Sequence, residues 1–163
     1  MKTLWFYGKD EEALISLAEQ VGEELINKDQ HVEIIVHSEV QEILGRGLKD
    51  TKEDISTFID RLGFLGNLLH RNNVFALIVS KDPSLNDREL IKKTYGNYIQ
   101  VNLDETDTLC DIDLSKTNEQ KSNVKKIIEY LINQKAIPEA SHTVYSEEEE
   151  GEIRRRLEEL GYV

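Results

Sequence analysis

Short, continuous apolar runs alternate with segments of helical periodicity along most of the chain. The runs are rich in β-branched residues and lack the polar alternation of a half-exposed strand, as expected for strands that are covered on both faces of a parallel sheet. We expect strands at residues 3–7, 32–37, 74–79 and 98–103, and a weaker one at 112–114. The sequence therefore predicts an α/β protein, a three-layer sandwich with a mostly parallel five-stranded sheet.

Helices are predicted between these strands. In the first, apolar residues share one face, and the second opens with Thr51 and Asp54 in the spacing of a capping box. Further helices are expected at residues 86–95 and 119–134. Because crossovers between parallel strands are right-handed, a ligand is expected beyond the carboxyl ends of the strands.

The chain divides into three predicted parts, an α/β domain at 1–134, a surface connector at 135–145 and an amphipathic helix at 146–163. In the last part, Ser146 and Glu149 have capping-box spacing, acidic residues come before arginines, and an apolar stripe runs through Ile153, Leu157 and Leu160. Two interpretations stay open. This helix docks on its own domain, or it is an arm that binds a partner or a second copy.

Composition excludes several classes of function. The formal net charge of −12 argues against a nucleic-acid partner, which requires clustered Lys and Arg. No apolar run approaches the length of a membrane span, and no secretory signal precedes Leu4, so we expect a soluble cytoplasmic protein without a membrane partner. The single cysteine, Cys110, is expected to be a small buried hydrophobe.

Several segments resemble one enzyme family between Leu4 and about Asp113. They are LWFYG, HVEIIVHSEVQEIL, GRGLKDTKEDISTFIDRLGFLGNLLHRNN, VFALIVSKDPSLNDREL and GNYIQVNLDE. These segments are similar to adenylylsulfate kinases (APS kinases), P-loop enzymes that phosphorylate adenosine 5′-phosphosulfate on its ribose 3′ oxygen with MgATP. The resemblance implies the P-loop nucleotide-kinase fold.

The phosphate loop of that family is degenerate in this chain. The family pattern is G-x-x-x-x-G-K-[ST], whose backbone N–H groups wrap the phosphates. Gly8 keeps the first position, but Ala13 stands at the second glycine, Leu14 at the lysine and Ile15 at the hydroxyl residue. The resemblance therefore implies no cofactor-binding residue here.

Other positions of the family's site are also replaced. The acidic pair and the arginine after the second strand fall on Val36, Ser38 and Gln41, which leaves no expected base or metal ligand. The substrate-binding segment is replaced at four positions, Asp50, Ile55, Phe58 and Asp60. The basic lid after the fourth strand is missing, and the carboxylates at 104–113 are expected to be a solvated acidic loop rather than a cation site.

Three weak candidates for ligand binding remain, Lys52, Arg61 and Ser80. With no catalytic residue, cofactor or metal expected, the resemblance predicts a catalytically inactive, kinase-like protein. Its role would be regulatory or in protein interaction in sulfur or nucleotide metabolism, as a homodimer or with a protein partner, and with doubtful nucleotide binding. Two alternatives stay open: an allosteric sensor of adenosine phosphosulfate or its 3′-phosphorylated form (PAPS), and a divergent, ATP-dependent adenylylsulfate kinase with a relocated site.

Overall fold

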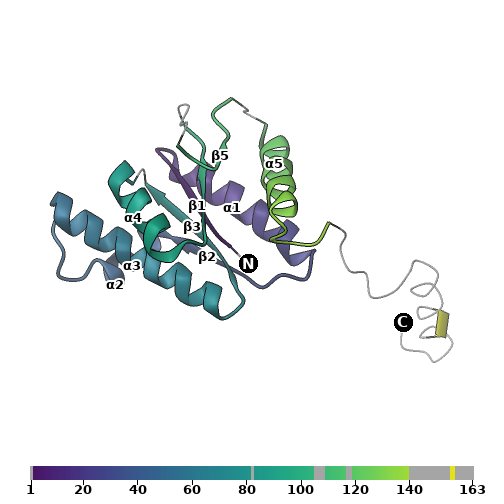
Figure 1. Cartoon of the computed structure of the whole chain (residues 1–163), viewed down its shortest axis with the longest axis horizontal. Helices are drawn as coiled ribbons and strands as arrows, with labels where there is room; N and C mark the ends of the chain where they lie inside the picture. The colour runs from purple at the N-terminus through teal and green to yellow at the C-terminus, as the bar shows by residue number, and fades with distance from the viewer. Residues whose placement is uncertain (1, 82, 105–108, 117–118, 140–154, 157–163) are drawn as a thin grey trace.

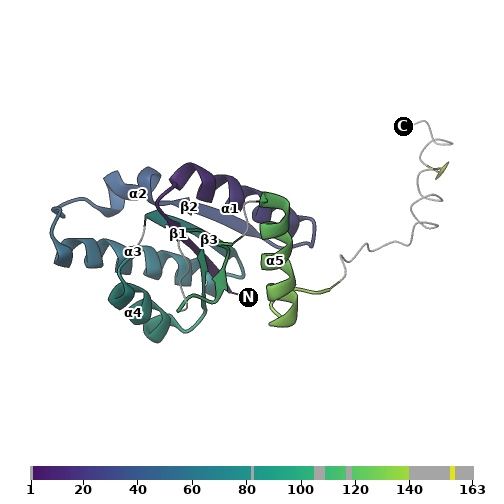
Figure 2. The same cartoon turned by 90° about the horizontal axis from the view of Figure 1, so that it is seen from above.

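In the computed structural model, five strands form one sheet between two layers of helices (Figures 1 and 2). The structure describes residues 2–81, 83–104, 109–116, 119–139 and 155–156. The strand order is β2-β3-β1-β4-β5, and every neighbouring pair is parallel. The predicted α/β fold class is confirmed.

The elements follow the predicted order closely. The strands are β1 (Thr3–Gly8), β2 (Val32–Val36), β3 (Phe75–Lys81), β4 (Tyr98–Asn102) and β5 (Ile112–Asp113). The helices are α1 (Glu11–Ile26), α2 (His37–Leu44), α3 (Lys52–Arg71), α4 (Leu85–Tyr95) and α5 (Gln120–Asn133).

Helix α2 is the element that periodicity did not predict. It is short, has no fully buried residue, and its N-cap, Val36, makes no side-chain capping bond, so its sequence lacks a capping signal. His37, predicted to end the second strand, instead begins α2.

The central strand β1 is buried along its whole length and pairs with β3 on one side and β4 on the other. Its side chains point alternately to the two helical layers. Leu4 and Phe6 belong to the core with α1 and α5, whereas Trp5 and Tyr7 belong to the core with α3 and α4. Because both faces are covered, the strand reads as a continuous apolar run.

Helix starts are fixed by local capping bonds. Thr51 accepts a hydrogen bond from the Asp54 N–H at 3.2 Å, as its spacing predicted. Asp10 and Ser84 cap α1 and α4 in the same way. Each such cap is typically worth about 1 kcal/mol of stability.

The part of the chain after α5 is described only in places. The predicted surface connector begins packed on the core, since Ile137 is 5% exposed. The predicted helix at 146–163 lies outside the described residues except for Arg155 and Arg156, which are helical and exposed. None of the described helices is long and apolar enough to span a membrane.

Helix α3 lies close to the sheet because glycines face it. The Tyr98 hydroxyl donates a hydrogen bond to the Gly63 carbonyl oxygen, and burial raises the pKa of this phenol. A Cβ on Gly66 would lie 2.6 Å from the Tyr98 hydroxyl oxygen and 2.8 Å from Ile78 Cδ1. A side chain at this position would therefore push α3 away from the sheet.

Two glycine substitutions in helices are expected to have opposite effects. At Gly22 in α1, a Cβ would make ordinary contact, 3.5 Å from Leu77 Cδ1, so Gly22→Ala should stabilise the fold by about 0.5–1 kcal/mol through helix propensity. Gly66→Ala should instead destabilise it by about 1–3 kcal/mol, because the overpacking outweighs the same gain in propensity. Urea unfolding of both variants measures the difference, and changes of the same sign would contradict it.

Candidate functional site

Residues far apart in sequence meet at the carboxyl edge of the sheet. Gly8 at the end of β1 is paired in register with Lys81 of β3, and Tyr7 is paired with Asn102 of β4. On the far side of β3, β2 ends at Val36, where α2 begins. This edge is where a doubly wound α/β protein binds its ligands.

Carboxylates occupy the backbone donors of the turn between β1 and α1. The Lys9 N–H donates to Asp104 Oδ2 at 2.6 Å, and the Ala13 N–H donates to Asp10 Oδ1 at 3.1 Å. The carboxyl atoms of Asp104 lie 3.1–3.2 Å from where a Cβ on Gly8 would be, so the lack of a side chain at Gly8 admits this carboxylate. Internal anions therefore sit where a phosphate loop would present its donors to a ligand.

The three replaced positions of the phosphate loop are helical residues of α1. Leu14 is fully buried in the core, and Ile15 packs against it. Ala13 is half-buried in the first turn, where its N–H is bonded to Asp10. None of these three side chains carries a polar group for a phosphate.

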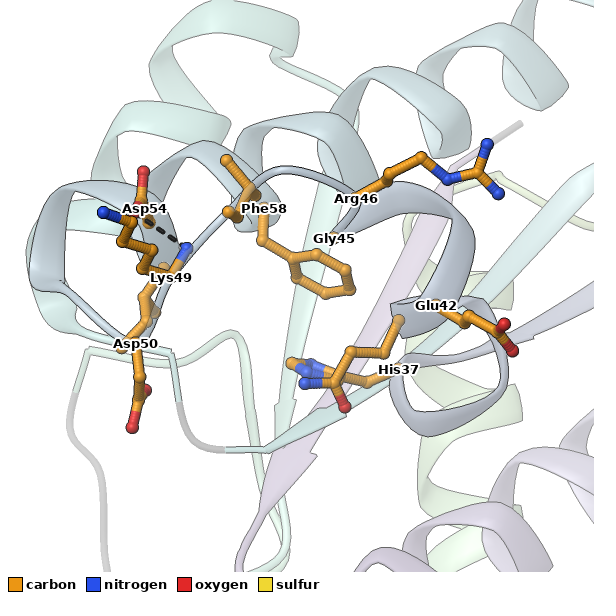
Figure 3. Close-up of a pocket in the computed structure, with 11 residues that line it drawn as sticks. His37, Glu42, Gly45, Arg46, Lys49, Asp50, Asp54 and Phe58 are labelled. Carbon is orange, nitrogen blue, oxygen red and sulfur yellow. Dashed lines mark hydrogen bonds between the residues drawn. The ribbon is translucent and has the colours of Figure 1, made fainter.

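A cavity of about 490 Å³ opens between α2 and α3. Figure 3 shows its labelled residues. His37 and Phe58 lie side by side, Lys49, Asp50 and Asp54 lie to one side of them, and Arg46 and Glu42 lie to the other. The cavity thus combines an aromatic wall with charged groups of both signs.

The wall of this cavity is held by bonds between α2, α3 and the loop that joins them. The Arg61 guanidinium on α3 donates to the carbonyl oxygen of Leu44, the last residue of α2. The Lys49 N–H donates to Asp54 Oδ2 at 2.9 Å, which fixes the loop at the start of α3. These bonds position α2 although it buries none of its own residues.

The surroundings of His37 in this cavity shift the pKa of its imidazole. Its ring centroid is 4.5 Å from that of Phe58, and its Nδ1 is buried with no hydrogen-bond partner among the described residues. Burial lowers the pKa of His37, Glu11 raises it, and Lys81 lowers it, with a net decrease. The imidazole is therefore neutral near pH 7 and can accept a proton.

The structure does not bring the three predicted ligand-binding residues together. Lys52 is exposed at the start of α3, Arg61 is bonded to the Leu44 carbonyl, and buried Ser80 accepts a hydrogen bond from Trp5 Nε1 at 2.6 Å. None of them lines the α2–α3 cavity. Their role in ligand binding stays a prediction.

Sequence reasoning missed His37, Arg46 and Lys49, which do line the cavity. Asp50, Ile55 and Phe58, which stand where the family has substrate-binding residues, line it as well. For His37, a usable signal was its place at the end of a predicted buried strand, at the ligand-binding edge.

The acidic segment near β5 makes internal contacts. Asp111 forms an ion pair with Lys92 at 2.6 Å, and the Asp113 carboxylate accepts a hydrogen bond from the Ser115 N–H at 3.0 Å. Within the described ranges, no group of three or more His, Cys, Asp or Glu residues could hold a metal ion. The family's magnesium ligands fall on Ile15 and Ser38, so the described residues do not fit a magnesium site of that kind.

Comparison with known proteins gives the family. A family model described as Adenylylsulphate kinase matches residues 1–133. The chain belongs to the adenylylsulphate kinase family. The resemblance found in the sequence is thereby confirmed.

Curated relatives of this chain are named adenylyl-sulfate kinases. The adenylyl-sulfate kinase of Rippkaea orientalis is 27% identical, and the match covers 99% of this chain and 93% of the relative. For the adenylyl-sulfate kinase of Gloeothece citriformis the identity is 28%, over 67% of this chain and 62% of the relative.

Solved structures of the same family share the fold. The Mycobacterium tuberculosis APS kinase CysC in complex with AMPPNP and APS has a TM-score of 0.71 at 17% identity, over 80% of this chain and 96% of that chain. A hexameric APS kinase from Thiobacillus denitrificans also has a TM-score of 0.71, over 83% of this chain but 29% of that one. This likeness confirms the P-loop nucleotide-kinase fold.

These comparisons contradict the prediction of a catalytically inactive protein. The matching curated relatives are named adenylyl-sulfate kinases, so the family points to an enzyme, and doubtful nucleotide binding loses its support. The prediction was wrong because it tied each role to one motif position. A role can pass to another side chain at the same edge of the sheet, where His37 lies one residue from two replaced positions.

Acidification is expected to destabilise the fold through His37. Because burial lowers the pKa of folded His37, the unfolded chain takes up the proton first as the pH falls below the ordinary value of 6.5. The free energy of unfolding should therefore decrease below that pH. Urea unfolding at about pH 7.5 and about pH 5.5 should show a smaller decrease in His37→Gln than in the unmodified chain. An equal decrease in both would contradict the assignment.

Proposed function

We propose that this chain is a divergent adenylyl-sulfate kinase, an ATP-dependent phosphotransferase whose reacting groups meet in the α2–α3 cavity. The observation that carries the proposal is the place of His37, a half-buried and neutral base at the carboxyl end of β2. The cavity volume of about 490 Å³ falls within the usual range for small-molecule sites.

His37 acts as the general base in this proposal. Because Nδ1 is buried, the other ring nitrogen, Nε2, accepts the proton of the substrate hydroxyl while that oxygen attacks the γ-phosphorus of ATP. The bond between the γ-phosphorus and the bridging oxygen breaks, and ADP leaves with the electron pair. The imidazolium then returns its proton to solvent. A base that is neutral at working pH is suited to this task.

The remaining cavity residues bind the substrate. Arg46 and Lys49 offer positive charge to the sulfate and phosphate groups, and the part of the buried Phe58 side chain that lines the cavity offers an apolar contact to the purine. Local cations matter here because the chain as a whole carries a net charge of −12, which repels a free nucleotide.

The triphosphate of ATP is placed toward Lys81 rather than deep in the β1–α1 turn. Lys81 lies next to Gly8 in the sheet and is close enough to His37 to lower its pKa. A phosphate that entered the turn would have to displace Asp104 from the Lys9 N–H. Because the described residues offer no fitted metal site, no step is assigned to a protein-held metal.

Removing the base should slow turnover strongly while leaving the substrate bound. In His37→Gln, we expect kcat for ADP release with ATP and adenylyl sulfate to fall about 100-fold or more, because general-base catalysis contributes that much. The control is His70→Gln, at the far end of α3, which should keep kcat. An unchanged kcat in His37→Gln would overturn the assignment. Binding of adenylyl sulfate without any ADP release in the unmodified chain would favour the sensor alternative.

Two neighbouring lysines test whether the substrate binds in the cavity or at a residue that the sequence predicted. Lys49 lines the cavity, whereas Lys52, a weak candidate from the sequence, is exposed on α3 outside it. Lys49→Ala should raise KM for adenylyl sulfate about tenfold, the usual loss for one charge-assisted contact, and Lys52→Ala should not change it. The reverse pattern would return the site to Lys52.

The proposal includes self-association of the chain, and the expected state is a homodimer. Support comes from the hexameric APS kinase among the structural neighbours and from Phe64 and Leu68 of α3, which are 55% and 40% exposed. A cytoplasmic location also stays a prediction, consistent with a reaction that consumes ATP.

A further inference from the structure

A second cavity, of about 530 Å³, is lined by residues of α1 and α5. These two helices cover the face of the sheet away from α3 (Figure 2). The floor of the cavity contains Val124 and Ile128 of α5, each 8% exposed. Glu23 and Glu24 of α1 form one rim, and Lys121 lies on the other. We call this feature the α1–α5 groove.

The α1 rim of the groove is electrostatically unfavourable as it stands. Glu23 and Glu24 lie near the carboxyl end of α1, where the helix dipole is negative, and the last turn of α1 has no basic residue. Ile26, three residues after Glu23 and therefore on the same side of the helix, is 59% exposed. An occupant with both apolar and basic groups would offset the charge and cover this side chain.

The chain itself ends in a segment of that chemistry. If residues 146–163 form a helix, Ile153, Leu157 and Leu160 share one face of it. Arg156 would then lie about 60° from Ile153 around the helix, whereas Arg155 would lie about 160° from it. Both arginines are helical in the structure.

The route of the chain brings this segment to the groove. After α5 the described chain runs to Glu139, whose carbonyl oxygen accepts a hydrogen bond from Lys28 Nζ at 3.1 Å, just beyond the end of α1. The six residues 140–145 can span about 20 Å. The 18 residues 146–163 make a helix about 27 Å long, which is close to the length of α1, about 24 Å.

We propose that residues 146–163 fold as a helix in the α1–α5 groove of their own chain. The apolar stripe covers Val124 and Ile128, and Arg156 faces the glutamates of α1. The docked helix would complete the layer of helices on this face of the sheet. This inference does not depend on the reaction that the protein catalyses.

Hydrogen–deuterium exchange of the full chain, read by mass spectrometry, tests the proposal. Amides of the second half of α1 and of α5 should exchange about tenfold faster in Leu157→Glu, because the apolar stripe no longer docks. Arg156→Glu should accelerate exchange about fivefold, and the matched control Arg155→Glu should leave it unchanged. Adding Glu24→Arg to the Arg156→Glu variant should restore slow exchange, because the charge pair between these two positions is then re-formed with its signs reversed.

Two results would overturn the proposal. In one, exchange in α1 and α5 is the same in Leu157→Glu as in the unmodified chain. In the other, the amides of α1 and α5 lose their protection from exchange when the protein is diluted, and the mass in solution halves over the same range of concentration. That result would place the helix on a second copy. Urea unfolding of each variant checks that faster exchange comes from the groove and not from global loss of stability.

Discussion

Burial of β1 on both faces is the constraint on which the rest of this structure depends. Its six residues are inaccessible, and their side chains supply both cores. Pairing with β3 and β4 then fixes which residues meet at the carboxyl edge, including Gly8 beside Lys81. The candidate site is thus a consequence of strand order as much as of any motif.

At the carboxyl edge of the sheet, carboxylates of the protein itself accept hydrogen bonds from the backbone N–H groups. A phosphate loop leaves its N–H groups open for a ligand. Here Asp104 and Asp10 accept bonds from Lys9 and Ala13, and Glu11 accepts one from the Ser38 N–H at the start of α2. In the proposed function, recognition of an anionic substrate therefore depends on the side-chain cations of the α2–α3 cavity rather than on these backbone donors.

The fold could be predicted from the sequence because its signals are local. Continuous apolar runs identify the buried strands, and Thr51 with Asp54 marks the start of α3. The site could not be predicted in the same way. The bond of Lys9 to Asp104 joins residues 95 positions apart, and the burial that lowers the pKa of His37 arises only when α2 packs beside α3. Comparison with a motif shows which residues of a site are replaced, but it does not show which other side chains the fold brings to that site.

The bond from Arg61 to the Leu44 carbonyl has a consequence for how residues of this protein are classified. Arg61 matches a family position and anchors one wall of the cavity, yet it does not line that cavity. A survey of substitutions scored on activity alone would group Arg61 with residues that contact substrate. The contact that the structure shows is architectural: the bond to the Leu44 carbonyl oxygen holds α2 beside α3 and so shapes the cavity.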